Sequence, residues 1–194
     1  MTSNYLEQCA RRADVALERV RLRVAPAPHS LNPELALADL PETPRVLFLC
    51  RRNLCLSPLA ERYARLCDEA GAARFDSAGF PSTESRTSST RAIDVASGYG
   101  VDLTTHRSRR VTEAMLDESA LVVVMDAYDY RDLRRGFGDR SGVLFLSAFD
   151  DGPVEIDDPR DEGWYASKAA CERVTDAVRN LVATLGGQRV ATPA

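Results

Sequence analysis

The chain has 194 residues, 44% of them hydrophobic, and a formal net charge of −4. This length and apolar content suit one compact domain of about 140–150 residues with an extension, and the negative charge argues against a nucleic-acid or anionic-membrane partner. Lys168 is the single lysine among 25 basic residues. That bias indicates a GC-rich coding genome, so we expect a bacterial source.

The extension is predicted to comprise residues 1–44. Residues 4–24 carry apolar side chains at three-and-four spacing, which predicts a helix; the stripe is Leu6, Ala10, Ala13, Leu17, Val20 and Val24. Five prolines follow before residue 45 and predict a linker or a strap over the domain. The apolar stripe must be buried, either against the same chain or in a contact with a second copy or another partner.

Strands and helices alternate in the rest of the chain. Strands are predicted near 45–50, 73–78, 121–125 and 143–146, and helices near 58–70, 88–99, 112–119, 127–135 and 164–185. Such alternation is typical of an α/β fold: a four-stranded parallel sheet with helices on both faces. We expect this domain to span residues 45–188, with 189–194 as a tail.

The first strand runs into a cysteine, Cys50, which a short polar loop and a helix start follow. The carboxyl end of a strand is where α/β folds bind ligands. Backbone amides of residues 51–57 could form an anion nest beside the positive end of the helix dipole, a setting that favours the thiolate of Cys50. Asn53 suits a left-handed loop conformation. Ser57, expected as helix cap before Pro58, could donate to the sulfur.

The same segment also allows a purely structural interpretation, in which Cys50 and Cys55 are small core residues between a buried strand and a capped helix. The full string, however, resembles the signature of low-molecular-weight protein tyrosine phosphatases, whose loop reads Cys, five residues, Arg, Ser and usually Pro. Further blocks of that family are matched downstream, in the same order, by Asp76-Ser77-Ala78-Gly79, residues 100–109, residues 121–126 and Asp157-Asp158-Pro159.

This resemblance implies roles for individual residues. Cys50 matches the nucleophile, and Asp158 matches the general acid that protonates the leaving oxygen, a contribution of typically about 10²–10⁴-fold. Asp157 precedes that acid, and His106 would join the hydrogen-bond network of the loop. Without the resemblance, Asp-Asp-Pro is simply good turn chemistry, and a lone histidine is usually structural.

Two loop positions depart from the family. Leu56 stands where the family has the arginine that holds the phosphoryl group, and Arg52 stands at a loop glycine. A stabilising arginine is worth roughly 10³–10⁵ in rate, so we expect weak activity unless Arg51 or Arg52 replaces it. The anion site is therefore expected to comprise Arg51, Arg52, Asn53, Leu54, Cys55, Leu56 and Ser57.

Residues 80–91 are predicted to form the other wall of the site. This segment is polar, with Arg86 and Arg91, and acidic and basic residues follow Pro159, so nothing favours phosphotyrosine over a more polar or anionic substrate. Asp126, Asp129 and Asp132 are expected to be surface or helix-cap residues, although Asp126 follows a strand and could help line the site.

Five cysteines, an odd number, indicate no disulfide scaffold, and no signal peptide or membrane span is recognisable. A reducing cytoplasm is the expected location. No cofactor is expected, and with only two histidines no zinc-ligand spacing is present. The family resemblance would allow a protective disulfide between Cys50 and Cys55.

Three functions remain open at this point. The first is a cysteine-dependent phosphomonoesterase with a modified loop, acting through a phosphocysteine on a phosphorylated or otherwise anionic small molecule or protein. The second is a pseudophosphatase that binds an anion or a partner. The third is thiol or redox chemistry at Cys50 and Cys55, as in arsenate-reducing relatives of this fold.

Overall fold

The computed structural model describes residues 10, 12–17, 19–20, 33–80, 84–159 and 163–190. Its centre is one sheet of four parallel strands in the order β2-β1-β3-β4. The strands are β1 (Arg45–Cys50), β2 (Arg74–Gly79), β3 (Leu121–Val124) and β4 (Val143–Phe145). This is the predicted fold class, and each predicted strand lies within one residue of its observed position at the start and the end.

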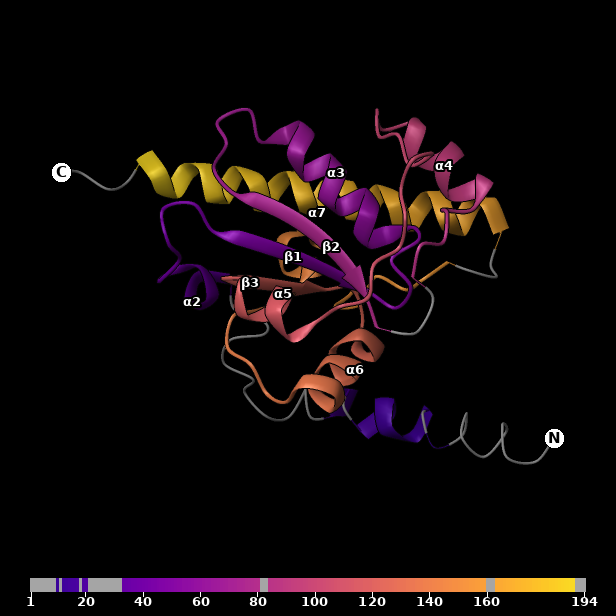
Figure 1. Cartoon of the computed structure of the whole chain (residues 1–194), viewed down its shortest axis with the longest axis horizontal. Helices are drawn as coiled ribbons and strands as arrows, with labels where there is room; N and C mark the ends of the chain where they lie inside the picture. The colour runs from indigo at the N-terminus through magenta and orange to yellow at the C-terminus, as the bar shows by residue number, and fades with distance from the viewer. Residues whose placement is uncertain are drawn as a thin grey trace.

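Helices cover both faces of this sheet (Figure 1). They are α2 (Pro33–Leu37), α3 (Leu56–Cys67), α4 (Thr90–Ser97), α5 (Glu113–Asp117), α6 (Ala127–Phe137), the 3-10 helix η1 (Leu146–Phe149) and α7 (Gly163–Val190). Residues of α3, α4 and α7 pack on one face in a core that includes Phe48 and Val123. Residues of α5 and α6 pack on the other, against Leu47 and Val124.

Burial on both faces explains the composition of the strands. In β1 every residue after Arg45 is buried, and all of β3 is buried, so both read as continuous apolar runs rather than as an alternating pattern. All strands point the same way, and β1 lies between β2 and β3. The loop after β1 and the segments after its neighbours therefore meet at one edge of the sheet.

The described part of the extension packs on the domain. Residues 12–17 and 19–20 are helical, as predicted, and lie beside α6 (Figure 1). Val15 is 1% exposed, and Asp14 and Arg19 form ion pairs with Arg135 and Glu155. This supports the prediction of contact with the same chain; the remaining residues of the predicted helix lie outside the described ranges.

Other residues of the extension differ in burial. Leu17 and Val20 are about half exposed, at 53% and 54%, so a contact with a second copy or partner stays a prediction. In the proline segment, Leu37 of α2 is buried in the core cluster that α3 and α7 share. Among the described residues, no helix combines the length and the apolar character that crossing a membrane requires.

Candidate active site

The loop between β1 and α3 turns back beneath the cysteine that ends the strand. Cys50 is 6% exposed and closes β1. The helix α3 begins at Leu56 with Cys55 as its N-cap, which has no side-chain cap hydrogen bond. The expectation that Ser57 caps this helix was therefore wrong, because the turn into α3 starts two residues earlier. Ser57 lies instead in the first turn, with its hydroxyl 2.9 Å from the Cys50 sulfur.

Asn53 is the residue around which the loop is built. It is fully buried and adopts a φ of 52°, the left-handed conformation that its residue type predicted. Its amide nitrogen donates to the hydroxyls of Ser57, at 3.0 Å, and Ser77, at 2.8 Å. Its side-chain oxygen accepts from the Arg109 amide at 2.9 Å. Three partners therefore fix one side chain, and with it the curvature of the loop.

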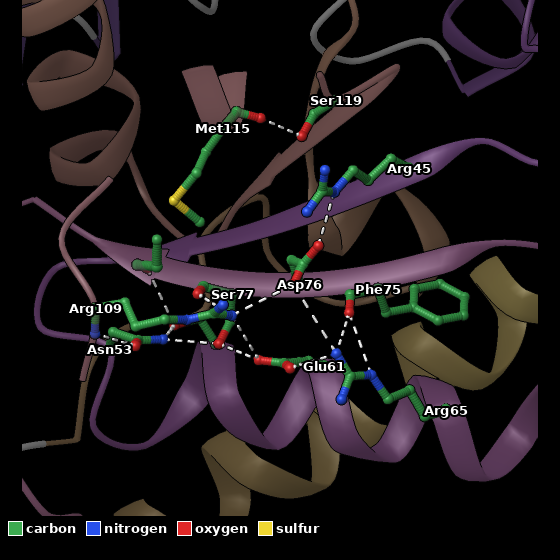
Figure 2. Close-up of polar contacts among 12 residues, drawn as sticks. Arg45, Asn53, Glu61, Arg65, Phe75, Asp76, Ser77, Arg109, Met115 and Ser119 are labelled. Carbon is green, nitrogen blue, oxygen red and sulfur yellow. Dashed lines mark hydrogen bonds and ion pairs between the residues drawn. The ribbon is translucent and has the colours of Figure 1, made fainter. Parts of the chain in front are cut away.

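A paired polar network continues from Asn53 between β2 and α3 (Figure 2). Ser77 donates in turn to the carboxylate of Glu61 on α3. Glu61 also pairs with Arg65 at 2.7 Å and with Arg109 at 3.6 Å, and the Arg109 side chain donates to the Ser77 carbonyl at 3.0 Å. The side of the loop that faces away from solvent is thus satisfied.

His106 supports the loop from a different segment. Its Nε2 lies 2.8 Å from the Asn53 carbonyl oxygen. Since a carbonyl only accepts, this nitrogen carries the proton and donates. Burial lowers the pKa of His106, which favours a neutral ring at neutral pH. The position agrees with the network role that the family resemblance implies.

Gly79, at the end of β2, lets the loop approach the sheet. A Cβ at this position would lie 2.8 Å from both the Arg52 carbonyl carbon and the Asn53 nitrogen. These are backbone atoms that a side-chain rotation cannot move away. The Ser77-Ala78-Gly79 block that ends β2 therefore has a steric cause at its last position, because only glycine leaves room for the loop.

The outer side of the loop opens into a cavity of about 580 Å³. Cys50 and Asp158 both line it, as do Arg52, Leu54, Cys55 and Leu56 from the loop. The opposite wall consists of residues 86–90, within the segment expected there. Two predicted site residues lie elsewhere: Asp157 is exposed and Arg51 does not line the cavity, although its carbonyl accepts from the Phe80 amide.

Burial works against the expected activation of Cys50. Burial, followed by the charges of Asp129 and Asp158, raises the pKa of the Cys50 thiol to about 11, against a smaller opposing effect of the Ser57 hydrogen bonds. The preference of the loop for the thiolate stays a prediction, and burial of the thiol opposes it. With sulfur as the donor to Ser57, the serine hydroxyl can donate to the Ala78 carbonyl 3.4 Å away.

Leu56 helps to explain why the Cys50 thiolate is not favoured by its surroundings. It is 1% exposed, belongs to the main core cluster and also borders the cavity. An apolar side chain therefore stands where the family has its loop cation, and this position supplies no charge to offset the cost of burying a thiolate. Of the two arginines expected as substitutes, Arg52 lines the cavity, and it forms no ion pair within the described part of the chain.

Two acidic residues after β3, Asp126 and Asp129, are buried. Asp126 caps α6 by accepting from the Asp129 amide at 2.8 Å, as predicted. Asp129 is 2% exposed, so its expected place at the surface was wrong. Burial and the neighbouring carboxylates of Asp126 and Asp158 raise the pKa of Asp129 well above its usual range. Periodicity along α6 carried no signal for a buried acid near the cysteine.

A second thiol pair lies behind the loop. The Cys55 side chain hydrogen-bonds to that of Cys171 on α7, which raises the pKa of Cys55 and lowers that of Cys171. Cys50, Cys55, Cys67 and Cys171 are all free thiols. The family resemblance allowed Cys50 as the partner of Cys55, and nothing in the sequence pointed to Cys171.

Known proteins share this fold and arrangement. The model of the family described as low molecular weight phosphotyrosine protein phosphatase matches residues 45–191. A low molecular weight protein-tyrosine-phosphatase of Streptomyces coelicolor is 31% identical over 160 residues, covering 75% of this chain and 96% of the relative. Bacterial relatives agree with the source that the arginine bias indicated.

Solved structures agree with the sequence matches. The arginine phosphatase YwlE of Geobacillus stearothermophilus superposes with a TM-score of 0.71 at 22% identity, over 78% of this chain and 98% of that one. The tyrosine phosphatase Wzb of Escherichia coli, in complex with sulphate, gives 0.67 at 25% identity, over 74% and 99%. The chain belongs to the low-molecular-weight phosphotyrosine protein phosphatase family.

Proposed function

We propose that the protein is a phosphomonoesterase that uses Cys50 as nucleophile and Asp158 as general acid, at a low rate. The observation that carries this proposal is that both residues line one cavity, with Ser57 2.9 Å from the sulfur. The amides of residues 51–57 would hold the phosphoryl oxygens, with the guanidinium of Arg52 as the substitute cation. The structural neighbour from Escherichia coli is in complex with sulphate, which agrees with oxyanion binding by this fold.

The reaction has two steps. The Cys50 thiolate attacks phosphorus, the bond to the ester oxygen breaks, and Asp158 gives its proton to the departing alcohol. A water molecule then attacks the phosphocysteine; Asp158 takes a proton from that water, and phosphate leaves with the thiolate restored. His106 and Asn53 take no part in bond changes and keep the loop in shape.

The rate is limited by charge. With a thiol pKa of about 11, only a small share of Cys50 is ionised at neutral pH. The missing loop arginine removes stabilisation worth roughly 10³–10⁵ in rate in related phosphoryl transfers. Arg52 replaces part of that stabilisation only when its planar guanidinium reaches the phosphoryl oxygens.

Phosphate release from p-nitrophenyl phosphate tests the proposal. Wild type is expected to be slow but measurable, Cys50→Ser inactive, and Asp158→Asn reduced about 10²-fold or more. Arg52→Gln should lower kcat/KM, whereas Arg51→Gln, a matched loop arginine that does not line the cavity, should not. Equal inactivity of wild type and Cys50→Ser over a broad panel of phosphate esters would overturn the proposal.

A pseudophosphatase is the second candidate, and the raised pKa of Cys50 is the observation that favours it. Such a protein would bind an oxyanion without turnover. Calorimetry with vanadate or sulfate distinguishes the two: binding to wild type together with no Cys50-dependent phosphate release identifies the binding module.

Thiol chemistry is the third candidate, favoured by the Cys55–Cys171 contact. Mild peroxide would oxidise two thiols to a disulfide and be reduced to water. Peptide mass spectrometry then separates a Cys55–Cys171 bond from the Cys50–Cys55 bond that the family resemblance allows. Recovery of all these cysteines as independent thiols or sulfenic acids would exclude this candidate.

A further inference from the structure

The cavity wall opposite the loop is held in a defined conformation. The Ser85 amide donates to the Ser108 carbonyl at 2.8 Å, and the Arg86 amide donates to the Ser108 hydroxyl at 3.1 Å. The Ser108 amide donates back to the Arg86 carbonyl at 2.9 Å. This pairing ties the wall to the segment that also carries His106, so the wall has a fixed position relative to the catalytic loop.

Ser88 in this wall has an unused hydrogen-bonding group. The residue is 5% exposed and lines the cavity, and its hydroxyl oxygen has no hydrogen-bond partner among the described residues. Leaving a buried hydroxyl unpaired destabilises a fold, which is why such groups are rare. A ligand oxygen in the cavity would supply the missing partner.

Two cationic features surround this hydroxyl. Arg86 lines the cavity and forms no ion pair with any described residue. Helix α4 begins at Thr90, directly after Ser89, whose side chain caps only the Ala92 amide at 3.2 Å. The other first-turn amides lack an intrahelical partner by helix geometry, and they carry the positive end of the helix dipole. Charge and hydrogen-bond donors at this wall therefore suit an anion.

The cavity is large enough for two anionic groups. Its volume of about 580 Å³ far exceeds what one phosphoryl group needs, since one water takes up about 30 Å³. The charged residues of its lining are Arg52, Arg86 and Asp158, so the positive charges outnumber the negative one. They also lie on two different walls, with Arg52 in the loop and Arg86 beside α4.

We propose that the ligand of this cavity carries two anionic groups: a phosphoryl group that binds the loop at Cys50, and a phosphate or carboxylate that binds Arg86, the Ser88 hydroxyl and the first turn of α4. This proposal specifies the substrate class of the proposed phosphomonoesterase. It rests on that proposed function only for the phosphoryl group at Cys50. It also gives the divergent site a second source of binding energy where the loop arginine is missing.

Binding of non-hydrolysable diphosphonates tests this without any need for turnover. Methylene-, propylene- and pentylene-diphosphonate are titrated into wild type by calorimetry, each beside the monophosphonate of the same chain length. One or more diphosphonates should bind about 10-fold or more tightly than its monophosphonate, because each added charge-assisted contact is worth at least that factor. Equal affinity across every pair would overturn the proposal.

Variants locate the second group. Arg86→Gln and Ser88→Ala should remove the diphosphonate preference and leave monophosphonate affinity unchanged. Arg91→Gln is the matched control, because Arg91 is an exposed arginine of the same helix start that does not line the cavity; it should keep the preference. A loss of both ligands alike in Arg86→Gln, or an unchanged preference in both wall variants, would contradict the assignment.

Ser88→Ala offers a second readout. Since the free protein leaves this hydroxyl unpaired, its removal should leave the melting temperature unchanged or raise it, while weakening the diphosphonate. A lowered melting temperature with intact diphosphonate affinity would show a structural hydroxyl and sink the proposal. The two proposals fail separately: a diphosphonate preference without phosphate release refutes only the phosphomonoesterase, and phosphate release without that preference refutes only the second anion site.

Discussion

The two sides of the Cys50 loop differ in how completely their polar groups are hydrogen-bonded or paired with opposite charges. On the side against β2 and α3, Asn53 has three side-chain partners, and Ser77, Glu61 and Arg109 continue the network (Figure 2). On the cavity side, Leu56 is apolar and the Cys50 thiol has a pKa of about 11. The hydroxyl of Ser88, on the opposite wall, has no hydrogen-bond partner within the described ranges.

This difference separates what fixes the loop conformation from what stabilises the thiolate and binds the phosphoryl group. Loop conformation comes from hydrogen bonds and from the close approach at Gly79, and none of these needs a charge inside the loop. Thiolate stability and phosphoryl binding need that charge. A chain can therefore keep the loop of a phosphatase while changing what the loop does.

The largest effect is expected from Leu56→Arg on the cavity side. Leu56 borders the cavity, so a longer side chain can extend into open space, and kcat/KM on p-nitrophenyl phosphate should rise by about 10³-fold or more. Leu56→Met is the control for size without charge and should leave the rate unchanged. A folded Leu56→Arg protein no more active than wild type would show that the missing charge at this position does not limit the rate.

Asn53→Ala addresses the other side. It removes three side-chain hydrogen bonds and leaves buried partners unpaired, so the free energy of unfolding should fall by about 2–4 kcal/mol in urea denaturation. Asn53→Gly keeps the left-handed backbone at lower strain and should lose less than the alanine variant. Loss below about 1 kcal/mol in both would show that the network does not hold the loop.

Gly79→Ala tests the close approach. The new Cβ would lie 2.8 Å from backbone atoms of Arg52 and Asn53, and the shift this forces should cost about 1–3 kcal/mol. Gly136→Ala, with open space around the new atom in α6, should instead stabilise by about 0.5–1 kcal/mol. Equal effects of the two alanines would mean that the loop yields freely.

The smallest effect concerns the extension. Arg19 pairs with Glu155 through two hydrogen bonds of 2.7 and 2.9 Å, but it is 42% exposed. Arg19→Gln should therefore lower the free energy of unfolding by less than about 1 kcal/mol and leave phosphate release unaffected. A loss of activity on this change would tie the extension to the site.

Much of the fold and part of the site could be predicted from the sequence. The strands are short apolar runs buried on both faces, and their positions followed from that pattern. Asn53 and Ser57 lie in the loop where the family motif implies, since local spacing determines their positions. His106 lies where the later block of the family resemblance implies, in a segment that reaches the loop only through the fold. The start of α3 was missed because its N-cap, Cys55, has no side-chain cap hydrogen bond to signal it.

The electrostatic state of the site could not be predicted in the same way. The pKa of Cys50 depends on Asp129 and Asp158, which come from other elements, and on burial that only the packed fold defines. Arg109 turns toward Glu61 and Ser77 rather than into the cavity. The lack of a partner for the Ser88 hydroxyl among the residues that the structure describes depends on tertiary geometry. Side-chain direction across elements carries no signal in a single sequence.

The ionisation of Cys50 shows whether the loop stabilises its thiolate in the absence of the loop arginine. It can be followed by the ultraviolet absorbance of the thiolate, with Cys50→Ser as the blank. We predict an apparent pKa of about 11 in wild type and a lower pKa in Leu56→Arg, because a nearby positive charge favours the charged form.

The same ionisation should appear in stability. Because folding raises the pKa of this thiol from 9.0 to about 11, the free energy of unfolding should decline as pH rises through that interval, and less so in Cys50→Ser. A wild-type Cys50 that titrates below neutral pH would contradict the account, since the loop would then stabilise its thiolate without the arginine.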